Sequence, residues 1–333
     1  MRSTRLSLAL DSGALVLPSE GPVAVFHPKA GDDLAPLGRD RVRVITGFKP
    51  DHDAFAAQGY ACATEPEGSY AAAIVCLPRA RAEARALIAS AAAHLPEGAP
   101  LVVDGQKTDG IDSAISDLRK LAPVGEALAK AHGKLAVMHA PPAWVLAPWQ
   151  AQPTVLPGGL KTLPGVFSAD GIDPGSALLA AALPQKLPRR VADLGAGWGY
   201  LSREVLTRDG VAEVHLVEAD AAALDCAREN VTDPRAVFHW ADATDAKAAA
   251  QIGPVDAVVM NPPFHSGRAA DPALGLAFIR AAAGMLTTSG TLWMVANRHL
   301  PYEALLRERF REVEEIGGDS RFRLTRAARP IRT

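Results

Sequence analysis

The C-terminal half of the chain alternates between apolar, strand-like runs and helix-like segments, and this alternation constrains the fold more than any other feature. The runs VADL, VHLV and VDAVVM occupy residues 191–194, 214–217 and 255–260, and helix-like segments follow at 221–231 and 275–286. Strands separated by helices pair in parallel, because each helix carries the chain back across one face of the sheet. The pattern predicts an α/β fold with a mainly parallel, doubly wound sheet.

The end of the chain departs from this alternation. Residues 311–330 carry two strand-like runs around Gly317 and Gly318, with no helix between them. Strands joined by a short turn pair antiparallel. We therefore expect an antiparallel hairpin at the edge of the C-terminal sheet.

The N-terminal half contains a weaker copy of the same order. Residues 69–105 and 254–297 each run from an apolar strand through a proline corner and an alanine-rich helix to a second strand. This copy favours a duplicated domain that lost its chemistry, although two unrelated α/β units would also look alike. We expect two tandem Rossmann-like domains, the N-terminal one degenerate.

Residues 141–165 are rich in proline and glycine, which predicts an irregular linker between domains at 1–140 and 166–333. Trp144 and Trp149 suggest that this linker packs against a domain. The opening MRSTRLSLALDSGALVLP resembles a signal peptide only superficially, because Asp11 interrupts its apolar run. A strand and a turn are the expected structure there.

Composition narrows the class of protein. The formal net charge of the 333 residues is −2, which gives no overall basic footprint for nucleic acid but leaves room for a local one. The three cysteines form no C-x-x-C, and no apolar run reaches the roughly 18 residues of a membrane span. We expect a cytoplasmic, monomeric protein with no metal site and no membrane segment.

The segment VADLGAGWG places a glycine-rich corner between a strand and a helix. Asp193, Gly195, Gly197 and Gly199 form the pattern D-x-G-x-G-x-G, in which a ligand can approach the backbone closely. The dinucleotide pattern G-x-G-x-x-G/A requires a small residue at the position that Tyr200 occupies. The corner therefore favours S-adenosylmethionine over a dinucleotide.

Two acidic residues end the next two strands. Glu218 follows VHLV and can accept hydrogen bonds from ribose hydroxyls. Asp242 follows AVFHWA and can accept a hydrogen bond from an adenine amine, or instead cap a helix over ATDAKAAA. With the glycine corner, both acids indicate a cofactor that carries a nucleoside.

The segment NPPFH, residues 261–265, ends the strand VDAVVM. Its prolines cannot continue a central strand, so it is a stiff corner at the carboxyl edge, where open α/β sheets bind ligands. The Asn261 side chain and the Pro262 carbonyl can each accept a hydrogen bond from one planar amine, and Phe264 offers a face for a flipped base. His265 is left open between a substrate contact and packing.

These motifs resemble the bacterial ribosomal RNA guanine-N2 methyltransferases, with the RsmC-like, small-subunit enzymes first and the large-subunit enzymes next. The resemblance rests on GVFSADGIDPGSALLAAALP, VADLGAGWGYLS, NPPFHSG and VANRHLPYEALLRERF. It implies methyl transfer from S-adenosylmethionine to the exocyclic N2 of a guanine in ribosomal RNA, with 16S RNA or the small subunit as the expected partner. It also implies a degenerate N-terminal domain, 1–140, for RNA binding or scaffolding, and a catalytic domain at 166–333.

The resemblance also implies roles for single residues. The base would be held by Asn261, Pro262 and Phe264, and Phe167, with Ser168 and Asp170 beside it, would close over the cofactor. Cofactor binding would fall to Asp193, Gly195, Gly197, Gly199, Glu218 and Asp242.

Other acceptors and functions stay open at this level. An N-P-P-aromatic corner suits any planar amine or amide, so adenine N6, a protein glutamine or a 23S guanine are alternatives. A non-catalytic RNA-binding or assembly protein is a further alternative. The C-terminal arginines fit either an RNA contact or a solvated strand face; they are Arg321, Arg323, Arg326, Arg329 and Arg332.

Overall fold

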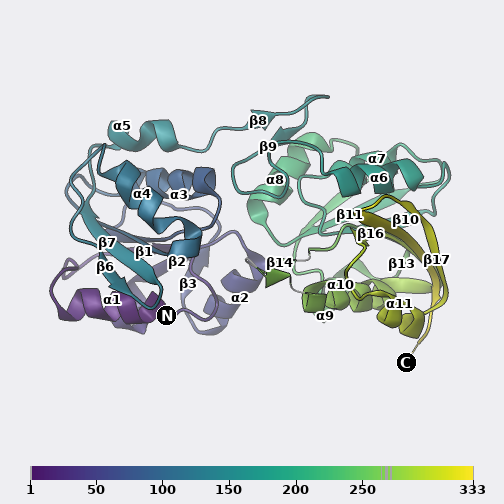
Figure 1. Cartoon of the computed structure of the whole chain (residues 1–333), viewed down its shortest axis with the longest axis horizontal. Helices are drawn as coiled ribbons and strands as arrows, with labels where there is room; N and C mark the ends of the chain where they lie inside the picture. Colours follow the sequence, from purple (N-terminus) through teal and green to yellow (C-terminus); the bar gives the residue numbers. More distant parts are fainter. Residues whose placement is uncertain (1, 264, 267–268, 271, 333) are drawn as a thin grey trace. The chain divides into compact units, whose positions relative to one another are not determined.

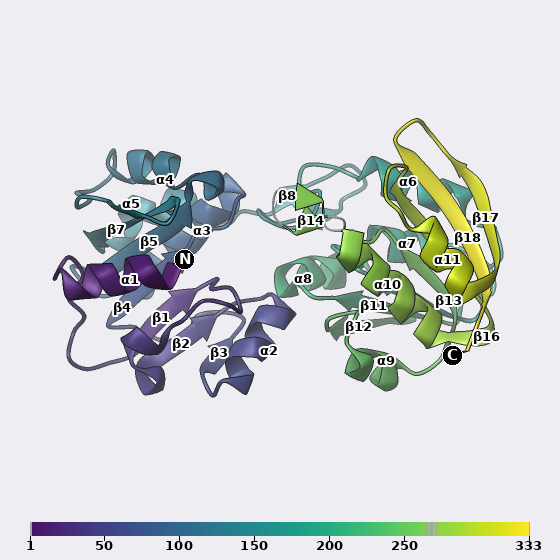
Figure 2. The same cartoon turned by 60° about the horizontal axis from the view of Figure 1, so that its bottom comes forward.

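The computed structural model describes residues 2–263, 265–266, 269–270 and 272–332. The chain forms two compact units, Met1–Pro153 with Leu163–Gly165 and Thr154–Thr162 with Val166–Thr333. Each unit contains one seven-stranded sheet with helices around it (Figures 1 and 2). The expectation of an α/β fold with two tandem Rossmann-like units is confirmed.

The two sheets have the same topology. Their orders are β3-β2-β1-β4-β5-β7-β6 and β12-β11-β10-β13-β16-β18-β17. In each sheet the first five strands are parallel and the last two antiparallel. The strand-by-strand match supports the duplication predicted from the weak internal repeat.

The N-terminal unit is built mainly from short helices and strands of three to seven residues. Its elements are α1 Arg2–Asp11, β1 Val23–Phe26, η1 Ala35–Leu37, η2 Arg39–Arg41, β2 Val42–Ile45, α2 Lys49–Ala57, β3 Ala61–Ala63, β4 Ala72–Cys76, α3 Arg81–Ala93, β5 Pro100–Gln106, η3 Lys107–Asp109, α4 Ile111–Leu118, β6 Leu128–Lys130, β7 Gly133–His139, α5 Ala143–Leu146 and η4 Ala147–Trp149.

The C-terminal unit begins with a small hairpin and ends with a long one. Its elements are β8 Thr154–Val155, β9 Lys161–Thr162, α6 Pro174–Ala182, β10 Arg190–Leu194, α7 Tyr200–Leu206, β11 Glu213–Glu218, α8 Ala221–Asn230, β12 Ala236–Trp240, α9 Ala246–Ile252, β13 Val255–Met260, β14 His265–Ser266, β15 Ala269–Ala270, α10 Pro272–Met285, β16 Leu286–Asn297, α11 Glu303–Arg309, β17 Phe310–Gly318 and β18 Phe322–Pro330.

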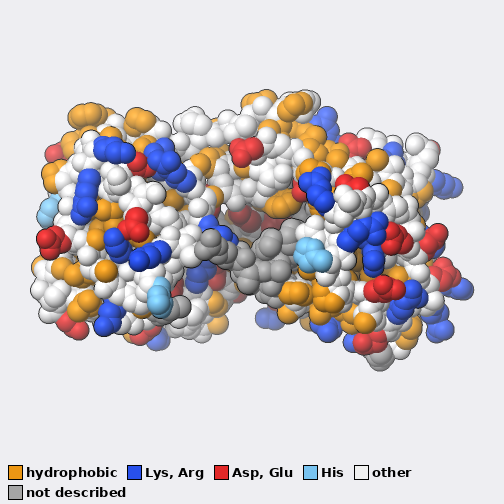
Figure 3. All heavy atoms as spheres, in the orientation of Figure 1, with side chains coloured by type: hydrophobic (Ala, Val, Ile, Leu, Met, Phe, Trp, Pro, Cys, Tyr) orange, Lys and Arg blue, Asp and Glu red, His pale blue; other side chains and the backbone are white. Residues whose placement is uncertain are grey.

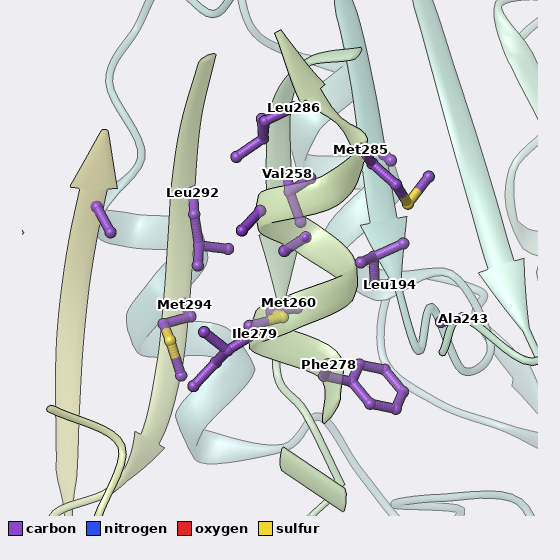
Figure 4. Close-up of a cluster of buried hydrophobic side chains, with 14 of the residues drawn as sticks. Leu194, Ala243, Val258, Met260, Phe278, Ile279, Met285, Leu286, Leu292 and Met294 are labelled. Carbon is purple, nitrogen blue, oxygen red and sulfur yellow. The ribbon is translucent and has the colours of Figure 1, made fainter. Parts of the chain in front are cut away.

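Helices cover both faces of the C-terminal sheet. On one face, Phe278 and Ile279 of α10 pack against Leu194, Met260 and Leu292 of three neighbouring strands (Figure 4). On the other face, side chains of α6, α7 and α8 form a second buried cluster with the same strands. A parallel sheet buried on both sides explains the near-continuous apolar runs in its sequence.

The antiparallel hairpin β17–β18 is confirmed, and three of its arginines pair with glutamates of β17 and α11. They form ion pairs with glutamates at distances of 3.2–3.9 Å, namely Arg323 with Glu303 and Glu315, Arg326 with Glu312 and Glu314, and Arg329 with Glu312. Such exposed pairs add little stability. This pairing favours the solvated strand face over a basic RNA tail.

Two predictions for irregular or extended segments are wrong. The opening residues form helix α1, because Leu6 and Ala9 are buried on one face of it. The segment 141–165 holds the short elements α5, η4, β8 and β9. Within it, the Arg85 Cζ lies 5.0 Å from the centre of the Trp149 ring, so this tryptophan packs against the N-terminal unit. Trp144, by contrast, is 76% exposed.

Helix α1 is anchored by a buried arginine. Arg5 has no exposed surface, and its Nη2 donates to Oδ2 of Asp104 on β5 at 3.0 Å. Its Nη1 also donates to the carbonyl of Lys130, the last residue of β6, at 3.1 Å. A buried ion pair of this kind stabilises little by itself, but losing one partner leaves a charge stranded in the core.

We therefore expect Arg5→Met to lower the free energy of unfolding by roughly 3–5 kcal/mol, because the buried Asp104 carboxylate then loses the Arg5 guanidinium. The double variant Arg5→Met, Asp104→Leu removes both charges and should recover most of this loss. Urea unfolding followed by circular dichroism measures both. A double variant as unstable as the single one would contradict this account.

In the part of the chain that the structure describes, no helix combines the length and the apolarity needed to cross a membrane.

Candidate active site

The predicted site residues that the structure describes lie along the carboxyl edge of the C-terminal sheet. Leu194 pairs with both Val217 and Met260, and Glu218 pairs with Trp240. The glycine corner, Glu218, Asp242 and Asn261 therefore follow strand ends that lie side by side, about 5 Å apart from one strand to the next. The parallel register brings together residues that are distant in sequence.

The glycine corner needs its glycines for two different reasons. Gly195, Gly197 and Gly199 have φ of +74°, +55° and +90°, which side-chain-bearing residues rarely adopt. A Cβ on Gly199 would lie 2.8 Å from Cγ2 of Val231, the C-cap of α8, and 3.3 Å from Cβ of Ala227 on that helix, so this glycine permits helix packing. A Cβ on Gly197 would meet no described atom within 4 Å. Gly197 thus faces open space in which a ligand can reach the backbone.

Glu218 ties the glycine corner to the end of β11. Its Oε2 accepts a hydrogen bond from the Gly197 N–H, and its Oε1 accepts one from the Asp220 N–H, both at 2.8 Å. Burial raises the pKa of this carboxyl, and the backbone hydrogen bonds oppose that rise. Each oxygen keeps a further lone pair, so the carboxylate can still receive hydroxyl donors.

Asp193 lies beneath the corner and is fully buried. The Ser202 hydroxyl donates to its Oδ2 at 2.7 Å, whereas its buried Oδ1 receives no donor from the described residues. Burial raises the pKa of Asp193 to about 7, although the Ser202 hydrogen bond acts in the opposite direction. A buried acceptor beside an open glycine cradle fits a ligand that brings N–H donors or positive charge.

Asp242 does not cap helix α9, which rules out that interpretation of the sequence. The N-cap is Asp245, whose carboxylate accepts from the Lys247 N–H at 2.9 Å. The Asp242 Oδ1 accepts from the backbone N–H and the hydroxyl of Thr244, at 2.8 and 2.7 Å. This turn holds the Asp242 carboxylate at the end of β12.

The proline corner continues directly from β13. Asn261 is partly buried, and its Nδ2 donates to Oδ2 of Asp173 and to Oγ of Ser176, both at 2.9 Å. Pro262 is buried. Phe264 lies outside the described residues, so its predicted stacking role stays a prediction.

Asp173 and Ser176 begin helix α6, which our sequence reasoning had not predicted as a helix. The signal was present as Asp-Pro-Gly-Ser before an apolar run, since aspartate is a favoured N-cap and proline a favoured first helical residue.

The segment around Phe167 lies beside the glycine corner, because Trp198 binds its backbone. The buried Trp198 donates from its indole Nε1 to the Phe167 carbonyl at 2.9 Å. The Phe167 side chain itself is 57% exposed. Ser168 has a φ of +54°, and its hydroxyl donates to the Gly171 carbonyl. Asp170 is exposed.

Among the residues placed in the structure, no three His, Cys, Asp or Glu side chains are grouped to hold a metal ion.

Two family models and named relatives match this chain. The family model described as the methyltransferase small domain matches residues 158–326, and the model for its N-terminal domain matches 48–133. Ribosomal RNA small subunit methyltransferase C of Salmonella choleraesuis is 31% identical over 75% of this chain and 73% of its own length. The Salmonella typhimurium protein of the same name is 30% identical over the same shares.

One solved structure matches almost the whole chain. It is a 16S rRNA N2 methyltransferase, RsmC, from T. thermophilus, in complex with AdoMet and guanosine. It is 26% identical and has a TM-score of 0.79, covering 98% of this chain and 93% of that one.

The fold and the site thus define a methyltransferase with a duplicated Rossmann-like architecture. The chain belongs to the methyltransferase small domain family and, within it, to the family of ribosomal RNA small subunit methyltransferase C. The family resemblance read from the sequence motifs is confirmed.

The raised pKa of Asp193 predicts a pH-dependent loss of stability in the cofactor-free protein. Its pKa is about 7 in the folded protein and about 4 in the unfolded chain, so the folded state is destabilised as pH rises from 4 through 7. Relative to wild type, Asp193→Asn should gain up to about 4 kcal/mol in unfolding free energy between pH 4 and pH 8. Denaturant titrations at several pH values measure this.

Asp225→Asn provides the matched control, because it makes the same replacement at an exposed side chain. An Asp193→Asn profile that runs parallel to that of wild type would contradict a raised pKa.

Proposed function

We propose that this protein transfers a methyl group from S-adenosylmethionine to the exocyclic N2 of a guanine in 16S ribosomal RNA. The observation that carries the proposal is the convergence, at one sheet edge, of an open glycine cradle, two acidic residues and Asn261. Membership of the ribosomal RNA small subunit methyltransferase C family supports it, as does the 26% identical relative solved with AdoMet and guanosine.

The cofactor side of the site is formed by the glycine corner and its carboxylates. In the proposal, Gly195, Gly197 and Gly199 let the cofactor approach the backbone, and the Glu218 carboxylate accepts the ribose hydroxyls. Further cofactor contacts come from Asp193, Asp242 and Phe167. When bound, S-adenosylmethionine supplies a methyl group bonded to a positively charged sulfur.

The base side is formed by the proline corner. The Asn261 Oδ1 and the Pro262 carbonyl accept the two hydrogens of the guanine amine, and Phe264 stacks on the flipped base. Holding both hydrogens this way turns the nitrogen lone pair out of conjugation and towards the methyl carbon. Because prolines make the corner rigid, the acceptors are placed before the substrate arrives.

The N-terminal unit serves RNA binding or scaffolding in this proposal. Its visible face carries several Lys and Arg side chains (Figure 3). The Asp117 carboxylate is surrounded by three cations, Arg81, Arg85 and Lys120. Their hydrogen bonds hold the pKa of this carboxyl well below its usual range, and the bond from Arg81 has the largest effect. Three cations around one carboxylate leave a net positive surface that suits phosphate. The protein would act as a monomer, in the cytoplasm, on naked RNA or an assembled small subunit.

We expect Asn261→Ala to abolish methyl transfer to guanine N2, to below about 1% of wild type, because one of the two amine acceptors is lost. Cofactor affinity should stay within about three-fold, since Asn261 lies on the base side. Tritiated-methyl transfer to ribosomal RNA, nucleoside mass analysis and calorimetry measure these quantities. Wild-type protein that methylates no guanine N2 would refute the proposed reaction, and an active variant would remove Asn261 from its role.

Glu218→Ala should weaken cofactor binding by roughly 10- to 100-fold, because a charged acceptor for the ribose is lost and the Gly197 N–H is freed. Glu213→Ala, at the opposite end of the same strand, is the matched control and should bind cofactor as wild type does. Isothermal calorimetry with S-adenosylmethionine compares them. Equal affinities would reassign Glu218 to a purely structural role.

A further inference from the structure

The amide of Asn261 is held by a helix start that lies far away in the sequence. Both of its N–H bonds are used, one towards Asp173 Oδ2 and one towards Ser176 Oγ, each at 2.9 Å. No described residue donates to its Oδ1. We infer that Asp173 is a positioning residue, whose carboxylate orients the Asn261 amide so that Oδ1 faces the substrate amine; this inference rests on the proposed function.

A carboxylate is suited to this task because it only accepts hydrogen bonds. An asparagine can present its oxygen or its nitrogen to a neighbour, and only the oxygen can receive an amine hydrogen. If the Asn261 amide flipped, its Oδ1 would face the Asp173 Oδ2, and two acceptors would stand 2.9 Å apart without a proton between them. Leaving partly buried polar atoms unpaired in this way is unfavourable enough to fix the orientation.

Ser176 holds the amide but does not choose its orientation. A hydroxyl rotates and can act as donor or acceptor, so it could pair with either end of the Asn261 amide. The discrimination therefore comes from Asp173. This difference separates the two residues in an experiment.

The start of α6 is built around this contact. Asp173 Oδ2 also accepts from the Ser176 N–H at 2.7 Å, which fixes the carboxylate as the helix N-cap. A Cβ on Gly175 would lie 3.1 Å from this same Oδ2 and 3.1 Å from Cε1 of Phe322, so glycine leaves room for the carboxylate between helix and sheet. With Pro174 as the first helical residue, Asp-Pro-Gly-Ser forms a rigid support for Asn261.

Capping alone does not explain the arrangement. Asp245 also caps a helix of this unit, and among the described residues its carboxylate accepts only from the Lys247 backbone N–H. The Asp173 carboxylate caps α6 and also receives a side chain from a neighbouring strand end.

The test replaces Asp173 with residues that keep the cap and differ in the contact to Asn261. Asp173→Ser is a good N-cap but is too short to reach the amide, so kcat for methyl transfer should fall about 10- to 100-fold. Asp173→Asn should retain most of the activity, because the Ser176 N–H at the helix cap holds the oxygen of the new amide at the place of Oδ2, where it still accepts from Asn261. Ser176→Ala leaves the carboxylate in place and should lose less than about five-fold.

Asp245→Ser makes the same replacement at the N-cap of α9 and should leave kcat unchanged. For every variant, the KM for S-adenosylmethionine should stay within about two-fold of wild type, because the proposed defect lies on the base side. Thermal unfolding identifies any variant that simply loses stability. A folded Asp173→Ser protein with wild-type kcat would overturn the inference.

A second readout does not depend on turnover. The Asn261 side-chain amide signals can be assigned by NMR from their loss in Asn261→Ala. In wild type they should be shifted and slow to exchange with solvent, and in Asp173→Ser they should move and exchange at least about ten-fold faster. Unchanged signals would also overturn the inference. If wild-type protein methylates no guanine, the proposed function fails, while this measurement still decides whether Asp173 holds Asn261.

Discussion

The parallel register of β10 with β11 and β13 is the constraint on which the site depends. It aligns Leu194 with Val217 and with Met260, so that a glycine corner, a carboxylate and a proline corner begin at one edge of the sheet. The Glu218 carboxylate then fastens the corner through the Gly197 N–H. A slip of one residue in either pairing would turn these side chains to the wrong face. The apolar cores on both faces of the sheet hold the register.

The two units show what the same architecture does with and without this edge chemistry. Both have one strand order, but β1 is followed by His27 at a φ of +56°, where the C-terminal unit has its glycine corner. In the N-terminal unit a buried Arg5–Asp104 pair joins α1 to β5. The shared topology preserves the fold, while the polar residues at the strand ends decide whether a unit can hold a ligand.

The predictions succeeded where local pattern and burial agree, and failed where a distant contact decides. The strands of the C-terminal unit are apolar because they are buried on both faces, and so they could be located. Helix α1 was missed because its short apolar run suits a strand equally well, and its burial depends on Asp104, about a hundred residues away. The arginines of β18 could not be separated from an RNA contact until their glutamate partners on α11 and β17 were known.

The sequence by itself determined the fold class, the family and the residues that end each strand, since strand periodicity, glycine corners and proline corners are local properties of the chain. Only the tertiary structure decided how those residues face one another. It set the burial that raises the pKa of Asp193, the role of Trp198 as the anchor of the Phe167 backbone, and the amide orientation of Asn261. These properties arise between elements that are close in space and far apart along the chain, so no local pattern contains them.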